Sequence, residues 1–122
     1  MKIAVVTGTS TGIGFETSLH LARNGYSVFA GMRNTAKAQP LIDAAKAESL
    51  PVQVLQMDVT DADSLQTAFA TIHAQGDVSL LVNNAGIGGA TPLELTPEVE
   101  HRQIFETNYF GTINCIQAVL PS

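Results

Sequence analysis

Short apolar runs alternate along this chain with longer segments in which apolar residues recur every three or four positions. The runs are rich in β-branched residues and predict strands that are buried on both faces. These predicted strands cover residues 3–7, 27–31, 52–57 and 78–82. The segments between them predict helices over residues 13–24, 35–49 and 60–75, followed by a longer helix over residues 97–120.

Local signals mark several helix ends. Asn24-Gly25 supplies a left-handed stop for the first helix. Pro40 is expected in the first turn of the second helix, or as an interruption of it, because proline has no amide hydrogen to donate. Thr96 is expected to cap the last helix and Pro97 to open it.

The strict alternation of strands and helices predicts the α/β fold class. Crossovers of helical length require parallel strands with right-handed connections. We therefore expect one Rossmann-like domain over residues 1–122, with strand order 3-2-1-4 and flanking helices. In such a half of a doubly wound fold, ligands bind at the carboxyl ends of strands one and four.

Composition and charge narrow the possible partners. The chain carries a net charge of −5 and no cluster of Lys and Arg, which disfavours nucleic acid and anionic membranes as partners. The single cysteine, Cys115, lies in an apolar run and favours a buried thiol in a reducing cytoplasm. His20, His73 and His101 lack the spacing of metal ligands, so no metal is expected.

A glycine-rich segment, TGTSTGIG at residues 7–14, follows the first predicted strand and opens the first helix. At this place a dinucleotide pyrophosphate meets free helix amides. Gly8 permits the sharp exit from the strand, Gly12 lets a cofactor approach the backbone, and Gly14 lets the helix pack closely on the sheet. The alternative is a plain turn; a P-loop is excluded because no Gly-Lys-Ser/Thr follows. The expected cofactor-binding residues here are Gly8, Ser10, Thr11, Gly12, Ile13 and Gly14.

The spacing of these glycines resembles the T-G-x-x-x-G-I-G signature of the classical short-chain dehydrogenases/reductases. Three further segments match that family in order: Asp58-Val59, the run Asn83-Asn84-Ala85-Gly86, and Asn108 in the long helix. The matches span essentially the whole chain. The resemblance implies the N-terminal half of that family's fold and a protein related to NAD(P)-dependent oxidoreductases.

The resemblance also implies roles for residues after the third and fourth strands. Asp58 resembles the carboxylate that accepts a hydrogen bond from the adenine amino group, with the Val59 amide beside it. The alternative for Asp58 is a helix cap. Asn84 and Gly86 resemble the pair that ties strand four to its neighbours and leaves room for the nicotinamide ribose, and the alternative is an ordinary Asn-Gly turn. Ala85 between them is also expected to bind the cofactor.

Coenzyme preference is expected to depend on the end of the second strand. An acidic residue there binds the 2′-hydroxyl of NAD and repels a 2′-phosphate. This chain has Met32 and then Arg33 at that place, and a guanidinium suits bidentate recognition of phosphate. NADP(H) is therefore favoured over NAD(H), the alternative being that Arg33 is only a solvated loop charge.

The family resemblance implies an active site of Asn, Ser, Tyr and Lys, of which only Asn108 has a counterpart here. The family tyrosine is followed four residues later by lysine, whereas Tyr26 is followed by Ala30 and Tyr109 by Ile113. Ser122 ends a helix and so does not match the family serine. We therefore expect a truncated member of the family that is inactive alone. The alternatives are a non-catalytic nucleotide-binding or self-assembling half-domain and one part of a split enzyme.

Strand order 3-2-1-4 leaves the strand 78–82 at an edge without charge or proline to protect it. The long helix adds an apolar face, formed by Phe105, Tyr109, Ile113, Ile116 and Leu120. We expect a homodimer or larger homo-oligomer that pairs through strand 78–82 and helix 97–120.

Overall fold

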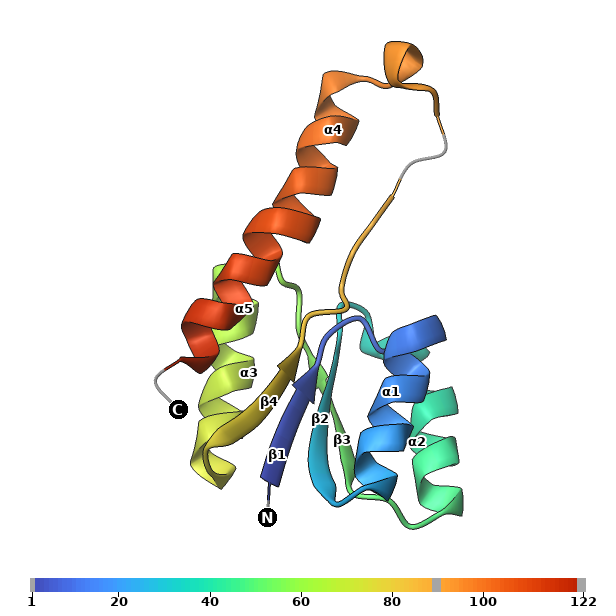
Figure 1. Cartoon of the computed structure of the whole chain (residues 1–122), viewed down its shortest axis with the longest axis vertical. Helices are drawn as coiled ribbons and strands as arrows, with labels where there is room; N and C mark the ends of the chain where they lie inside the picture. The colour runs from blue at the N-terminus through green and yellow to red at the C-terminus, as the bar shows by residue number, and fades with distance from the viewer. Residues whose placement is uncertain (1, 89–90, 121–122) are drawn as a thin grey trace.

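The computed structural model describes residues 2–88 and 91–120, which form a parallel four-stranded sheet between helices (Figure 1). The strands are β1 (Lys2–Val6), β2 (Tyr26–Met32), β3 (Val52–Gln56) and β4 (Val78–Val82). Their order is β3-β2-β1-β4, as predicted. Each strand differs from its predicted bounds by no more than two residues, and β4 matches them.

The helices cover both faces of the sheet (Figure 1). They are α1 (Gly12–Arg23), α2 (Gln39–Ala47), α3 (Ala62–Gln75), α4 (Glu98–Phe105) and α5 (Gly111–Val119). Side chains that alternate along β1 serve opposite faces: Val5 packs in a cluster with α3 and α5, whereas Val6 packs in a cluster that includes α1. Both valines are fully buried, so β1 is the centre of the core.

Two predicted helix boundaries change for identifiable reasons. The helix expected over 35–49 is divided into a 3-10 helix, η1 (Thr35–Lys37), and α2, with Pro40 in the first turn of α2. Helix α3 begins at Ala62 rather than at residue 60, because Asp61 is its cap. The Asp61 Oδ1 accepts hydrogen bonds from the amides of Asp63 (3.0 Å) and Ser64 (3.4 Å).

The last helix is not a uniform α-helix. Its two parts, α4 and α5, are joined by a π-helical segment at Glu106–Phe110. Thr96 is not its cap, because the Thr96 hydroxyl donates to the carbonyls of Thr91 (3.2 Å) and Pro92 (2.9 Å) and closes the preceding 3-10 turn. Pro97 is the cap residue instead. Helix α4 projects beyond the carboxyl ends of the strands (Figure 1).

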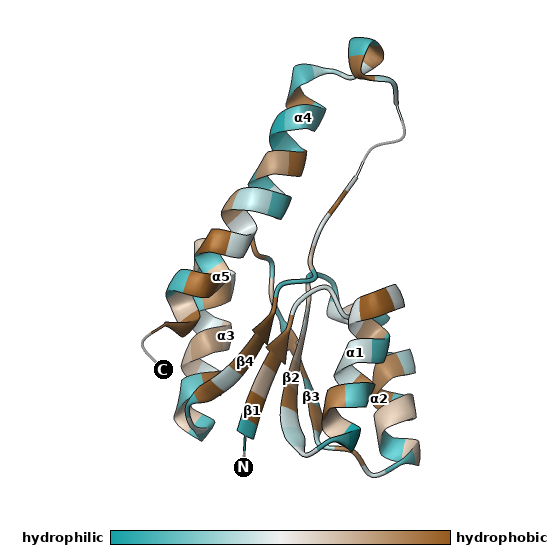
Figure 2. Ribbon diagram, viewed as in Figure 1, coloured by the Kyte–Doolittle hydropathy of each residue, from teal (hydrophilic) through white to brown (hydrophobic). Residues whose placement is uncertain are grey.

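Hydrophobic residues concentrate on the strands, but several also lie along the projecting helix (Figure 2). Phe105 and Tyr109 are 63 % and 55 % exposed, and Leu120 is 71 % exposed. The apolar face predicted for this helix is therefore turned largely away from the core of this chain.

No helix of residues 2–88 and 91–120 is long and apolar enough to cross a membrane.

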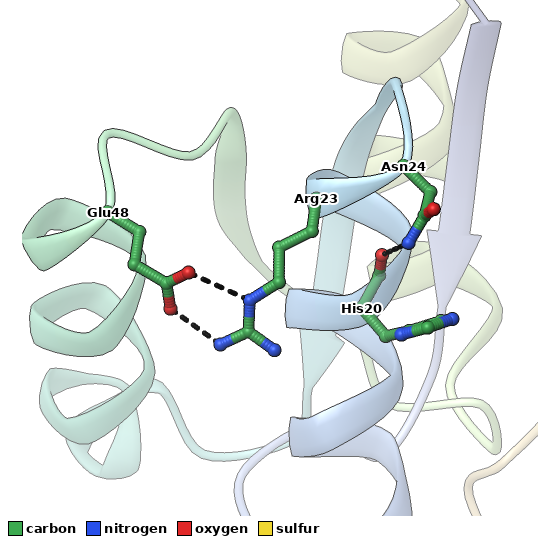
Figure 3. Close-up of polar contacts among 4 residues, drawn as sticks. All are labelled: His20, Arg23, Asn24 and Glu48. Atoms are coloured by element: carbon green, nitrogen blue, oxygen red, sulfur yellow. Dashed lines mark hydrogen bonds and ion pairs between the residues drawn. The ribbon is translucent and has the colours of Figure 1, made fainter.

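An ion pair joins the end of α1 to the end of α2, which lie on the face of the sheet opposite α3 and α5 (Figure 3). The guanidinium of Arg23, the last residue of α1, binds the carboxylate of Glu48, the first residue after α2. Nε of Arg23 lies 2.8 Å from Oε1 of Glu48. This hydrogen bond raises the pKa of Arg23 and lowers the pKa of Glu48. The Asn24 side-chain amide donates to the His20 carbonyl (2.8 Å), and Gly25 has φ +94°, so α1 ends at the predicted left-handed stop.

Candidate functional site

The loop after β1 is tied directly to the loop after β4. The buried Thr7 hydroxyl oxygen accepts hydrogen bonds from the amides of Asn84 (3.1 Å) and Ala85 (2.9 Å). The Asn84 side-chain amide donates to the Gly8 carbonyl (2.8 Å). Asn84 is therefore not an ordinary turn residue. Thr7 is a structural residue of the site to which the sequence motif assigned no role.

The three glycines of the glycine-rich segment are required for different structural reasons. Gly8 has φ +67°, and a Cβ there would lie 2.8 Å from the Cα of Ala85. A Cβ on Gly14 would lie 2.2 Å from the Gly8 carbonyl oxygen and 2.5 Å from Nδ2 of Asn84. The close packing predicted for Gly14 is therefore against these two loops, rather than against the strands. Gly12 has φ +64° and open space where its Cβ would be.

A pocket of about 320 Å³ lies where these loops meet the ends of β2 and β3. Nine of the twelve residues predicted to bind the cofactor line it: Gly8, Ser10, Thr11, Arg33, Asp58, Val59, Asn84, Ala85 and Gly86. The other three, Gly12, Ile13 and Gly14, form the first residues of α1, and Ile13 is 76 % exposed. No side chain caps the first turn of α1, so that turn offers its amides to a ligand.

The end of β2 forms the basic side of the pocket. Arg33, Asn34 and Lys37 line it together, and Lys37 was not predicted as a site residue. The Arg33 backbone is held in place because Nε2 of Gln56 donates to its carbonyl (3.3 Å). Within the described part of the chain, no carboxylate lies within 4.0 Å of the Arg33 or Lys37 side-chain nitrogens.

Asp58 forms the acidic side, after β3. Its Oδ1 accepts hydrogen bonds from the amide (3.0 Å) and hydroxyl (2.7 Å) of Thr60. The alternative of a helix cap is wrong for Asp58, because Asp61 performs that role. The Asp58 amide donates to the Ser64 hydroxyl (2.8 Å), which donates in turn to Oε1 of Gln56 (2.7 Å). Since Gln56 also holds the Arg33 carbonyl, one network positions both charged sides of the pocket.

Asn108 lies in the π-helical segment and does not line the pocket, although its neighbour Thr107 does. Its side chain makes two hydrogen bonds to the backbone of Ile87: Oδ1 accepts from the amide (2.8 Å) and Nδ2 donates to the carbonyl (2.7 Å). The Thr112 hydroxyl donates to the Asn108 carbonyl (2.9 Å). Asn108 thereby fixes the loop after β4 to the long helix.

The titratable groups of this pocket are Arg33, Lys37 and Asp58. They suit a ligand that carries an anionic group for the two cations and a hydrogen-bond donor for the carboxylate. Cys115 is fully buried away from the pocket, and burial raises the pKa of its thiol to about 11, which disfavours a nucleophilic role. Across residues 2–88 and 91–120, no three His, Cys, Asp or Glu residues are grouped to hold a metal. Ser122 lies outside the described residues.

Comparison with protein families gives a match over residues 2–122 to the short chain dehydrogenase model. An uncharacterized oxidoreductase of Myxococcus xanthus is 39 % identical over 121 residues, covering 98 % of this chain and 48 % of that protein. Human retinol dehydrogenase 8 is 38 % identical over 125 residues, covering 98 % of this chain and 39 % of that protein. The chain thus spans about half the length of the curated relatives it matches.

Solved structures show the same relation. The alcohol dehydrogenase of the archaeon Thermococcus sibiricus, complexed with 5-hydroxy-NADP, superimposes with a TM-score of 0.91 at 32 % identity. The match covers 100 % of this chain and 53 % of that one. The predicted fold, a parallel half of a doubly wound sheet, is confirmed by this similarity and by the strand order.

Proposed function

Because this chain belongs to the short chain dehydrogenase family, we propose that its pocket binds a nicotinamide dinucleotide and prefers NADP(H) to NAD(H). The observation that carries the proposal is the convergence on one pocket of the glycine loop, Arg33 and Asp58, which come from three separate strand ends. Parallel α/β sheets bind ligands at this place.

The residues present fit such a ligand. The uncapped first turn of α1 and the open space over Gly12 leave room for a pyrophosphate to reach backbone amides. Oδ2 of Asp58 has no hydrogen-bond partner among the described residues, so it is free to accept from an adenine amino group. The loop of Asn84 and Gly86 lies on the side where the nicotinamide ribose is expected.

The preference for NADP(H) rests on Arg33, which follows β2 and has no carboxylate partner within the described residues. A guanidinium binds two oxygens of a 2′-phosphate at once, whereas the ribose hydroxyl of NAD offers it no comparable charge. The Thermococcus sibiricus relative, complexed with 5-hydroxy-NADP, supports the choice of coenzyme.

Titration calorimetry with NADPH and NADH tests this proposal. We expect the unmodified chain to bind NADPH more tightly than NADH. Arg33→Ala should remove this difference by lowering the affinity for NADPH alone. Equal affinity of the unmodified chain for both coenzymes contradicts the preference. Absence of binding by either contradicts the function.

We further propose that this chain contributes the cofactor half of an oxidoreductase site. A bound nicotinamide supplies or accepts a hydride. The residues of this chain bind and orient the dinucleotide, and Asn108 fixes the adjoining loop. The sequence holds no Tyr followed four positions later by Lys, so no positioned acid is available for the accompanying proton. The chain alone is expected to show no steady-state NADPH oxidation with carbonyl substrates, and robust turnover by pure protein contradicts this.

A second proposal concerns assembly. In the described sheet β4 neighbours only β1, and its five residues, VSLLV, carry no charge or proline. An apolar edge of this kind is a template for pairing with another strand. We propose that β4 of two copies pair about a twofold axis, which also brings the exposed Phe105 and Tyr109 toward the mate. Sedimentation showing a stable monomer of 12.9 kDa at micromolar concentration contradicts the proposal.

A further inference from the structure

Lys37 lies in the same pocket as Arg33, four residues further along the chain. These two side chains are the cations of that pocket, whereas the chain as a whole carries a net charge of −5. Arg23 and Arg102 each bind a carboxylate, but neither Arg33 nor Lys37 has one within 4.0 Å among the described residues. Two unneutralised cations at one end of a pocket favour an anionic ligand group.

The position of Lys37 is fixed by its local structure. The Asn34 side chain accepts a hydrogen bond from the Ala36 amide (3.0 Å), and the Lys37 amide donates to the Asn34 carbonyl (3.2 Å). The next residue, Ala38, is buried in a cluster that includes Met32 and Leu41. This turn is therefore held at both ends, and it returns the side chain of Lys37 to the end of β2.

We propose that Lys37 is the second cationic arm of a 2′-phosphate site and a determinant of coenzyme specificity, an inference that rests on the proposed binding of NADP(H). A phosphate monoester carries a charge between about −1.5 and −2 near neutral pH, more than one guanidinium neutralises. The planar fork of Arg33 suits two phosphate oxygens, and the flexible ammonium of Lys37 suits the third as a point charge.

The test compares four proteins, the unmodified chain, Lys37→Gln, Lys37→Arg and Lys46→Gln, each titrated with NADPH and with NADH. Lys46 is the matched control, since it is an exposed lysine of α2 that does not line the pocket. We expect Lys37→Gln to weaken the binding of NADPH by about tenfold or more and to leave the affinity for NADH unchanged, as the loss of one hydrogen bond to a charged group predicts. Lys37→Arg should retain most of the NADPH affinity, and Lys46→Gln should retain both affinities.

The outcomes separate this inference from the proposed function. Suppose that the unmodified chain prefers NADPH, but that Lys37→Gln weakens the binding of both coenzymes equally or changes neither affinity. Lys37 is then not a specificity residue, and the proposed dinucleotide site is unaffected. If Lys46→Gln lowers the affinity for NADPH as much as Lys37→Gln does, the effect comes from the overall charge of the chain, and the inference is overturned. If the unmodified chain binds neither coenzyme, the function fails and the role of Lys37 with it. Thermal midpoints of the variants show that the differences do not come from unfolding.

Discussion

Replacement of Gly14 by alanine tests whether the two loops of the site are as closely packed as the structure indicates. The new Cβ would lie 2.2 Å from the Gly8 carbonyl oxygen and 2.5 Å from Nδ2 of Asn84, far inside van der Waals contact. One of these atoms is backbone, so α1 or the Gly8 loop must move. Such overpacking costs about 1–3 kcal/mol. Displacement of Asn84 from its hydrogen bond to Gly8 costs about 1 kcal/mol more.

The better helix propensity of alanine offsets about 1 kcal/mol of this cost. We therefore expect Gly14→Ala to lower the free energy of unfolding by about 2 kcal/mol, which equilibrium unfolding in urea measures as a drop of about 1 M in the midpoint. The matched control is Gly25→Ala, where φ is +94° and no atom lies within 4 Å of the added Cβ. That variant suffers backbone strain alone, about 1 kcal/mol. A loss for Gly14→Ala no larger than for Gly25→Ala refutes the packing argument.

Three further predictions concern other parts of the molecule. Burial raises the pKa of Cys115 from its ordinary 9.0 to about 11, so between these values the unfolded chain releases a proton that the native chain keeps. Stability should therefore fall as pH rises from 9 to 11, by up to about 3 kcal/mol, and Cys115→Ala should lack this part of the pH dependence in urea titrations. Asn108→Ala removes both hydrogen bonds to Ile87 and should lower the free energy of unfolding by about 1–3 kcal/mol. The variant should also bind NADPH more weakly. An unchanged affinity for NADPH would show that the loop holds its shape without Asn108. Ser49 has φ +54° just after α2, where its amide donates to the Lys46 carbonyl, so Ser49→Gly should raise the thermal midpoint and stabilise the chain by about 1 kcal/mol.

The architecture was predictable because it follows from local patterns. Apolar runs of strand length separated by helical segments leave a parallel sheet as the arrangement that buries them, and glycine, asparagine and proline mark the ends. Where two nearby residues offer the same capping signal, the local pattern does not decide which of them is the cap. Asp58 and Asp61 both precede α3, and only the position of its first turn decides that Asp61 is the cap.

Other features depend on contacts between distant segments, which no local pattern reports. The π-helical segment at Glu106–Phe110 accompanies the binding of Asn108 to Ile87 and the close approach of Gly111 to Val59. Lys37 was missed for a similar reason, because a turn capped by Asn34 brings it back to the pocket. Most of the predicted pocket residues were found because they lie at strand ends, and the ends of parallel strands meet at one edge of the sheet.

The central claim is that the pocket at the strand ends is a dinucleotide site, and titration of the isotope-labelled chain with NADPH, followed by backbone amide NMR, tests it most directly. We expect saturable shifts in four segments: residues 8–14, 33–37, 58–59 and 84–87. The amides of α2 beyond Pro40 and the exposed turns of α3 should remain unchanged. The absence of saturable shifts, or shifts centred on α3 and α5 instead of these four segments, would contradict the account.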